Sequence, residues 1–380
     1  MKNSDNSLRI PLIVALLVSV LMGFTAGVVG ELWVNNFLAP DLEFKSYRDL
    51  TKRIDDLLNE KNLGVKDILT DHDAAFERTI EEIAPVTATF YAYKDIGLSL
   101  ANVYLADDVL GSGFVLTSDG WLLTTTAVLP NPKMPYAVRV GDRVYRVEEI
   151  IADSMTPAVL VKVEANNLPV ANLGSKNSIY SSQSLLVASD VRGMKRINVS
   201  KLNYAEGTDV SELVHSSENY YKFIQLDDDF TSEYIGAPVV NLDGKVVALL
   251  LSETGSALPI DYLIRVMKSA VQSGEINRIL LGVNYLDLSQ TVNFETELRN
   301  GAWLTAVGGR RAVMPGTPAA ASGLQSGDVI LKVDADDITE QRSLTELIQE
   351  YNQGTEVTLT VRREGQDIKI PVVLTELKSN

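Results

Sequence analysis

The chain has 380 residues, of which 46% are hydrophobic and 22% are charged, a composition typical of a folded protein with two or three domains. Its formal net charge of -16 argues against nucleic acid as the main partner, because affinity for phosphate backbones comes largely from Lys and Arg. The absence of cysteine from the sequence excludes disulfides, thiol catalysis and Cys-based zinc sites, and only His72 and His215 could serve a mechanism that needs histidine.

An uncharged stretch near the N-terminus, residues 10–30, predicts a transmembrane helix over residues 10–33. At about 1.5 Å per residue, such a helix crosses a hydrocarbon core of about 30 Å. Basic residues precede the stretch and acidic residues follow it, so the positive-inside bias places residues 1–9 in the cytoplasm. The alternative is a cleaved signal peptide, whose apolar region usually has only about 7 to 15 residues. The length favours an uncleaved, single-pass anchor in the plasma (inner) membrane, with the bulk of the chain periplasmic or extracellular.

Residues 34–75 are predicted to form a helical stalk or linker. Apolar residues in this stretch are spaced for one helical face. These residues are Tyr47, Leu50, Ile54 and Leu57. A short coiled coil and an amphipathic helix packed on the next domain both fit the pattern. A further helix is expected over residues 76–85, where Pro85 ends it.

From Val86 to about Ala257 the chain consists of short runs rich in Val, Leu, Thr and Tyr, separated by Gly, Asp, Asn and Pro. Short strands with turn signals about every 8 to 12 residues are typical of an all-β barrel or sandwich. The next stretch, 258–274, has one apolar face and predicts a helix capped by Gly274. We place a domain boundary near Asn277.

The last segment, residues 278–377, predicts a separate, small α+β unit. It mixes strands with one helix at 343–354. That helix begins at Ser343, has Glu346 three residues later as in a capping box, and ends before Gly354.

Three stretches of the β-rich region carry a family pattern. They are "GSGFVLTSDGWLLTTTAVL" at 111–129, "DSMTPAVLVKV" at 153–163 and "FIQLDDDFTSEYIGAPVVNLDGKVVAL" at 223–249. In the right order and without gaps, they resemble the trypsin-like domain of the HtrA (Deg) family. The final segment looks like the PDZ domain that follows in this family, most closely at "PGTPAAASGLQSGDVILKVDADDI", residues 315–338. The resemblance implies a mainly β fold, with a trypsin-like double six-stranded β-barrel over 76–277 and an α+β PDZ domain over 278–377.

The departures from the family pattern fall at the positions that perform catalysis. Ala127 stands where the family has its histidine base, Pro157 where it has the orienting aspartate, and Ile235 where it has the serine nucleophile. A serine triad needs an imidazole to take the hydroxyl proton and a carboxylate to orient the imidazole. Glu233 replaces a glycine of the oxyanion loop, where its charge would repel the charge of the transition state. We therefore predict that the chain is not an enzyme but an inactive relative.

Relocated catalytic groups are the alternative. Ser232 lies three residues before the nucleophile position, His215 lies in a polar, loop-like stretch, and Asp153 has the sequence context of a turn carboxylate. We expect all three to be solvated loop residues, because a relocated triad requires three independent coincidences. The acidic run Asp227–Asp229 lacks the ligand spacing of a calcium loop. The sequence therefore predicts no metal ion and no cofactor.

The PDZ-like segment retains the features of a peptide-binding site. The stretch around Leu281 and Gly282 resembles the carboxylate-binding loop of the family, and the strand after it, 283–286, is expected to pair with a bound peptide. The helix from Ser343 would close the groove and supply its side-chain pocket. The predicted peptide-binding residues are Leu281, Gly282, Val283, Asn284, Leu344, Leu347 and Ile348.

These features together predict a membrane-anchored HtrA-like pseudoprotease. By this interpretation it binds protein C-termini or unfolded segments through its PDZ domain, and acts as a scaffold or regulator of extracytoplasmic protein quality control. HtrA barrels usually form trimers, so the resemblance implies a homotrimer or a heterotrimer with an active HtrA protease. The alternatives are an active endopeptidase with a non-standard nucleophile such as Ser232, and a purely structural membrane tether.

Overall fold

The computed structural model describes residues 18–20, 22–23, 25–26, 65–95, 102–205, 207, 209, 211–291 and 298–377. The chain divides into two compact units, Met1–His72 and Asp73–Asn380. The predicted transmembrane helix over 10–33 and the predicted stalk over 34–75 lie largely outside the described residues, so both stay predictions. Among the described residues, no helix is long and apolar enough to cross a membrane.

A helix, α3 (Val65–Ile83), precedes the first strand and is followed by a proline-containing 3₁₀ turn over Ala84–Val86. The helix predicted over 76–85 therefore ends close to the expected place but begins earlier. Its apolar residues Phe76 and Ile83 are buried in a cluster that also contains residues of both barrels. These contacts attach the end of the helix to the barrel region.

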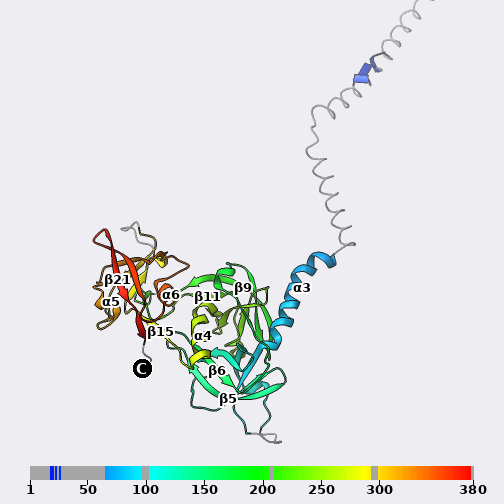
Figure 1. Ribbon diagram of the computed structural model, residues 1–380. Coiled ribbons are helices and arrows are strands. Elements are labelled where there is room, and N and C mark those ends of the chain that lie inside the picture. Colours follow the sequence, from blue (N-terminus) through cyan, green and yellow to red (C-terminus); the bar gives the residue numbers. More distant parts are fainter. Residues whose placement is uncertain are drawn as a thin grey trace, which may run out of the picture. The chain divides into compact units, whose positions relative to one another are not determined.

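The first barrel is closed by six antiparallel strands in the order β1-β2-β3-β6-β5-β4. Two of them, β5 and β6, are labelled in Figure 1. Its strands are β1 (Thr87–Ala92), β2 (Val109–Val115), β3 (Trp121–Thr125), β4 (Tyr136–Val140), β5 (Arg143–Ala152) and β6 (Ala158–Val163). One apolar cluster fills the interior, with Phe90, Leu122 and Val161 fully buried at its centre. Short apolar and β-branched runs between turn residues form these strands, as the sequence predicts.

The second barrel has six strands in the order β12-β8-β9-β11-β14-β13, closed by the pairing of β12 with β13. Its strands are β8 (Ser184–Ser189), β9 (Gly193–Tyr204), β11 (Phe223–Leu226), β12 (Pro238–Val240), β13 (Lys245–Leu250) and β14 (Ser256–Pro259). A short strand, β7 (Asn172–Leu173), is added to β13. The mainly β fold with two six-stranded barrels is therefore confirmed.

Helix α4 (Ile264–Ser273) follows the second barrel after a 3₁₀ turn over Ile260–Leu263, so it is shorter at its start than the helix predicted over 258–274. Gly274 ends the helix in the left-handed conformation, with φ +73°, and its N–H donates to the Ala270 carbonyl at 2.8 Å. The predicted glycine cap is confirmed.

Within Asp73–Asn380, residues 278–377 form a part that we call the C-terminal unit. It is built on one antiparallel sheet in the order β10-β16-β17-β18-β20-β21, with β19 beside β18. Its strands are β16 (Asn284–Asp287), β17 (Ala302–Leu304), β18 (Val329–Val333), β19 (Asp336–Asp337), β20 (Glu356–Arg363) and β21 (Gln366–Val373), while β15 (Arg278–Leu280) pairs with β22 (Thr375–Leu377). The edge strand β10 (Val214–Ser216) comes from the connection between β9 and β11 of the second barrel. A segment of the barrel region thus completes the sheet of the C-terminal unit.

Two short helices, α5 (Pro318–Ala321) and α6 (Leu344–Ile348), complete this unit. The predicted capping box at the start of α6 is confirmed, because Ser343 and Glu346 each accept a hydrogen bond from the backbone N–H of the other. The helix ends earlier than predicted. Directly after it, the Gln349 side chain exchanges two hydrogen bonds with the backbone of Ile279, at 2.6 and 3.1 Å, and anchors the helix end on β15.

Candidate functional site

The first group of predicted site residues occupies the three positions where the family resemblance places the triad. The Thr126 N–H donates to the Pro157 carbonyl at 2.8 Å, so the loops that hold Ala127 and Pro157 adjoin each other. Val128 packs in the same buried cluster as Ile235. The structure therefore brings the three family positions to one place, where the side chains are a methyl group, a pyrrolidine ring and a branched alkyl chain.

The backbone at the oxyanion position forms a 3₁₀ turn over Ser232–Tyr234, in which the Ile235 N–H donates to the Ser232 carbonyl at 3.0 Å. In serine proteases, the N–H groups of the nucleophile and of the residue two before it bind the oxyanion. Here the N–H at the nucleophile position, that of Ile235, already donates within the turn. The sequence signals a change through Glu233 in place of glycine, but it does not reveal the turn itself.

Glu233 places a negative charge on this loop. It forms an ion pair with Arg192, and the hydrogen bond from that guanidinium lowers the pKa of Glu233 to about 2. The Ser112 hydroxyl donates to the Glu233 carbonyl at 2.6 Å and fixes the backbone of the loop. The carboxylate is therefore ionised at neutral pH and would oppose an oxyanion forming nearby.

The residues considered for a relocated triad lie in separate environments. Ser232 is exposed in the 3₁₀ turn, as expected. His215 lies in strand β10 with its ring stacked on Tyr221, the centroids 3.7 Å apart. Asp153 is buried and forms an ion pair with Arg278. The prediction of solvated loop residues is wrong for His215 and Asp153, because each contacts residues distant in the sequence that the local pattern does not reveal.

The acidic run has separate partners for its first two carboxylates. Asp227 accepts a hydrogen bond from the Asn198 N–H at 2.7 Å, and Asp228 pairs with Lys195 at 3.0 Å. In the part of the chain that the structure describes, no group of three or more His, Asp or Glu residues could hold a metal ion.

The second group of predicted site residues surrounds the loop before β16. Gly282 has φ +92°, a left-handed conformation that favours glycine, and a Cβ at this position would lie 2.3 Å from Thr317. The Thr317 hydroxyl donates to the Met314 carbonyl at 2.6 Å, which holds the neighbouring turn in place. Glycine is therefore required here for the loop to present its N–H groups.

Those N–H groups bind two side chains from the connection between the barrel strands β9 and β11. The Glu218 carboxylate accepts hydrogen bonds from the Leu281 N–H at 3.1 Å and the Gly282 N–H at 2.9 Å. The Ser217 hydroxyl accepts from the Gly282 N–H at 3.3 Å and the Val283 N–H at 3.1 Å. Just before these residues, β10 pairs with β16. Sequence reasoning missed Ser217 and Glu218, because their polar surroundings are typical of a loop.

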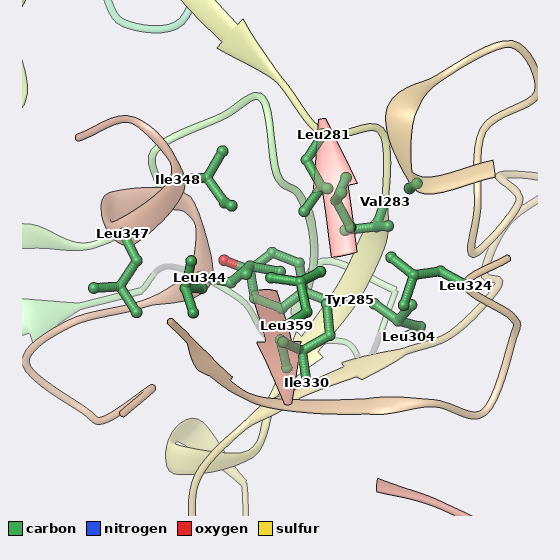
Figure 2. Close-up of a cluster of buried hydrophobic side chains, with 14 of the residues drawn as sticks. Leu281, Val283, Tyr285, Leu304, Leu324, Ile330, Leu344, Leu347, Ile348 and Leu359 are labelled. Carbon is green, nitrogen blue, oxygen red and sulfur yellow. The ribbon is translucent and has the colours of Figure 1, made fainter. Parts of the chain in front are cut away.

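Most of the predicted peptide-binding residues belong to one buried cluster shared by β16, its preceding loop and α6 (Figure 2). They are Leu281, Val283, Leu344, Leu347 and Ile348, each at most 1% exposed. Asn284 is also buried, and its side-chain amide donates to the Arg311 carbonyl at 2.7 Å. The helix residues predicted to line a side-chain pocket are thus buried in the hydrophobic core of this structure. Their role in peptide binding stays a prediction.

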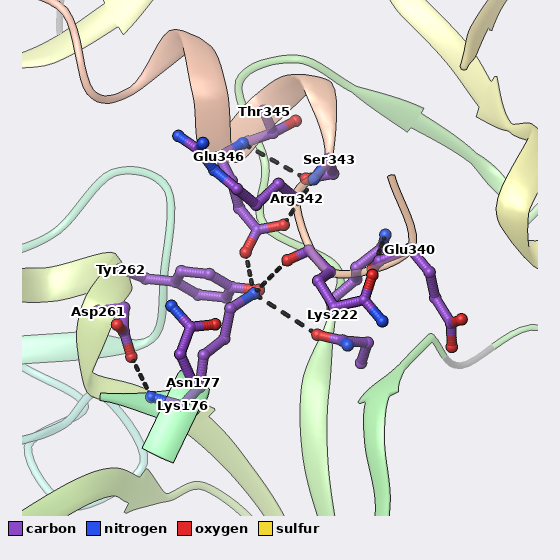
Figure 3. A network of polar contacts seen from close by, with 12 residues as sticks. Lys176, Asn177, Lys222, Asp261, Tyr262, Glu340, Arg342, Ser343, Thr345 and Glu346 are labelled. Atoms are coloured by element: carbon purple, nitrogen blue, oxygen red, sulfur yellow. Dashed lines mark hydrogen bonds and ion pairs between the residues drawn. The ribbon is translucent and has the colours of Figure 1, made fainter. Parts of the chain in front are cut away.

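Buried ion pairs join the C-terminal unit to the barrel region. They are Lys176–Glu346, Lys222–Asp287 and Asp153–Arg278. Figure 3 shows the first of these, in which the Lys176 ammonium reaches Glu346 on α6 and the Gln341 carbonyl, the latter at 3.1 Å. Buried charges are costly unless they are paired, and each of these charges has its partner on the other of the two parts. The sequence provides no signal for them, since each pair is separated by many residues.

His215 makes the folded state sensitive to pH. Burial lowers the pKa of His215 from 6.5 to about 4, while Asp287 raises it and Lys222 and Arg310 lower it. Between these two pH values His215 binds a proton in the unfolded chain but not in the folded chain, so its titration leaves stability unchanged above pH 6.5 and lowers it progressively towards pH 4. We expect the melting temperature of the wild type to fall more steeply over this range than that of His215→Phe, which keeps the stack on Tyr221. Equal slopes for the two proteins would contradict this account.

Two domain families match the chain. The trypsin-like peptidase domain family matches residues 111–249, and the PDZ domain family matches residues 289–374. Together with the two barrels and the sheet of the C-terminal unit, these matches define the class of protein as a trypsin-like domain followed by a PDZ domain.

Curated relatives narrow this class to one family. A "Probable periplasmic serine endoprotease DegP-like" of Marinomonas sp. (strain MWYL1) is 28% identical over 306 residues, which are 77% of this chain and 63% of the relative. The protein of the same description from Pseudomonas fulva (strain 12-X) is 30% identical over 268 residues, 67% of this chain and 53% of the relative. The chain belongs to the HtrA family, as its motifs indicate, and spans between half and two-thirds of the length of these relatives.

Solved structures show the same fold. The HtrA-type protease AlgW with a decapeptide matches with a TM-score of 0.58 and 20% identity, over 80% of this chain and 99% of that one. The same protease with a tripeptide matches with a TM-score of 0.59 and 21% identity, over 80% of this chain and 98% of that one. The order of barrels and PDZ domain is therefore that of an HtrA-type protease.

Proposed function

We propose that this chain is a pseudoprotease, an HtrA-like protein that binds protein C-termini or unfolded segments and does not cleave them. The observation that carries the proposal is the joint change at the triad and the oxyanion loop. Ala127, Pro157 and Ile235 offer no base, orienting carboxylate or nucleophile. The Ile235 N–H is used within a 3₁₀ turn, next to the ionised Glu233. The groups that accelerate acyl transfer in a serine protease are thus replaced together.

The PDZ domain supplies the binding function in this proposal. Its loop at Leu281–Gly282 binds the carboxylate of Glu218 through two N–H groups, and strand β16 carries an added strand, β10, beside it. Both are the elements by which β-strand addition captures a peptide C-terminus. That AlgW has been solved with a decapeptide and with a tripeptide supports peptide binding by a protein of this fold.

We further propose an extracytoplasmic site of action. Relatives described as periplasmic and the uncharged stretch within residues 10–33 support a single-pass anchor with a cytoplasmic N-terminus. On such an anchor the protein would act as a scaffold or regulator of protein quality control, as a homotrimer or in a trimer with an active HtrA protease.

The full chain, incubated with an unfolded protein, is expected to produce no cleavage products. The matched variant Ser232→Ala separates this proposal from the alternative of a non-standard nucleophile, because Ser232 carries an exposed hydroxyl three residues before the position of the family's nucleophile. Cleavage by the wild type that disappears in Ser232→Ala would show an active endopeptidase. Cleavage that is equal in both proteins would point to a contaminating protease.

A purely structural tether is the remaining alternative, and it differs in peptide binding. A tether would bind no peptide with a free C-terminus even at millimolar concentration, whereas the proposed function requires such binding. A screen of the full chain against random C-terminal peptides separates the two.

A further inference from the structure

The groove of the PDZ domain is occupied by the chain itself. Residues Val214–Glu218, which we call the inner segment, run antiparallel to β16, with Val214 opposite Leu286 and Ser216 opposite Asn284. The Ser217 N–H continues this ladder by donating to the Val283 carbonyl at 2.9 Å. The inner segment therefore takes the position that β-strand addition assigns to a bound peptide.

The end of the inner segment supplies the oxygens that a terminal carboxylate would supply. The Ser217 hydroxyl and the Glu218 carboxylate together accept hydrogen bonds from the N–H groups of Leu281, Gly282 and Val283. Ser217 is fully buried and Glu218 is 7% exposed. Three consecutive loop N–H groups thus point at two side-chain oxygens placed where the ladder ends, which is the arrangement expected for a captured C-terminus.

The Glu218 carboxylate is held for this role by its own segment. One of its oxygens accepts from the Ser217 hydroxyl at 2.6 Å and the other from the Ser216 hydroxyl at 2.7 Å. On the opposite side of the inner segment, the Thr345 hydroxyl of α6 donates to the Ser216 carbonyl at 3.4 Å. The inner segment is thus held between β16 and α6, the two elements that bound the predicted groove.

Contacts after the inner segment attach it to the PDZ domain. Tyr221 is buried in the PDZ core cluster, and its hydroxyl donates to Asp287 at 2.7 Å. Lys222 pairs with the same Asp287 and also donates to the Glu340 carbonyl, both at 2.7 Å. A segment tethered in this way reaches the groove at a high effective concentration, so a peptide in solution competes with it at a disadvantage.

We propose that the inner segment is a built-in ligand of the PDZ groove, with the Glu218 side chain in place of a terminal carboxylate, so that an external C-terminus binds only by displacing it. This inference rests on the proposed peptide-binding function. The competing partner is a protein C-terminus that forms a strand beside β16 and places its free carboxylate where Ser217 and Glu218 place their oxygens. Binding of such a partner would release the connection between β9 and β11 from the PDZ domain, and would thereby report occupancy of the groove to the second barrel.

The test compares the full-length wild type with Glu218→Ala, and uses Glu253→Ala as the matched control because Glu253 is exposed on the second barrel. The first measurement is amide hydrogen exchange at Leu281, Gly282 and Val283 without peptide. We expect faster exchange in Glu218→Ala than in the other two proteins, because only that variant removes the carboxylate that accepts from Leu281 and Gly282. The change should be largest at Leu281, because the Ser217 hydroxyl still accepts from the Gly282 and Val283 N–H groups.

The second measurement is binding of a synthetic peptide with the sequence of residues 211–217 and a free C-terminal carboxylate, with its C-terminal amide as the control ligand. We expect the free acid to bind Glu218→Ala about tenfold tighter or more than it binds the wild type and Glu253→Ala, the size of effect typical of a lost hydrogen bond to a charged group. The amide should bind Glu218→Ala more weakly than the acid does.

The outcomes separate this inference from the proposed function. Equal exchange in the wild type and Glu218→Ala, or equal affinity of the two for the free acid, would overturn the inference and leave peptide binding intact. Faster exchange in Glu218→Ala without binding of the peptide by any of the three proteins would support the built-in ligand and count against peptide binding as the function. Acid and amide binding equally well to Glu218→Ala would overturn the role assigned to the carboxylate.

Discussion

Replacing Lys222 with methionine is expected to lower the free energy of unfolding by about 3–5 kcal/mol, the cost typical of leaving one partner of a buried ion pair without the other. Lys222 and Asp287 are each 1% exposed and lie 2.7 Å apart. Methionine keeps most of the side-chain volume but removes the cation, so the Asp287 carboxylate keeps only neutral hydrogen-bond donors, the Tyr221 hydroxyl and the hydroxyl and backbone N–H of Ser289. Urea denaturation of the full chain measures the loss in the transition that includes the PDZ domain.

Lys195→Met provides the matched control for this prediction. Lys195 pairs with Asp228 at 3.0 Å, but the two side chains are 29% and 50% exposed. Exposed pairs contribute less than about 1 kcal/mol, so this variant should unfold close to the wild type. Adding Asp287→Asn to Lys222→Met should recover part of the loss, because the buried charge is then removed. Equal losses for Lys222→Met and Lys195→Met would show that burial does not control the effect.

Features with local chemical signals could be predicted from the sequence. The barrel strands coincide with short apolar runs between turn residues. The cap of α4 could be predicted from Gly274, because glycine has no Cβ and adopts the left-handed conformation without strain. The capping box of α6 follows in the same way from the spacing of Ser343 and Glu346. Each of these signals lies within a few residues of the structure it determines.

The occupied groove could not be predicted, because its determinants are far apart in the sequence. Glu218 and the Leu281 N–H that binds it are separated by 63 residues, and Tyr221 and the Asp287 carboxylate that accepts from it by 66. Locally, the stretch around Glu218 is polar and has the composition of a solvated loop. Its three-residue strand β10 becomes a strand only because β16 supplies the pairing partner. Tertiary contacts therefore decide the conformation of the segment that matters most for the groove.

The proposed loss of catalysis leads to the second large expected effect, which is the activity gained when the residue types of the triad are restored. The triple variant Ala127→His, Pro157→Asp and Ile235→Ser restores the residue types of the triad, in loops that already adjoin each other. We expect it to remain close to inactive, because the N–H of residue 235 still donates within the 3₁₀ turn and Glu233 keeps its charge.

Adding Glu233→Gly to the triple variant removes this charge and restores the glycine that the family has in the oxyanion loop. We expect kcat on an unfolded protein to rise by about 10²–10³ over the triple variant, the effect typical of one oxyanion-hole donor. The same quadruple variant with alanine at position 235 is the control, since it lacks the nucleophile and should lose the gained activity. A triple variant as active as the quadruple one would show that the turn and Glu233 do not limit catalysis. Loss of the triad side chains alone would then account for the inactivity that we propose.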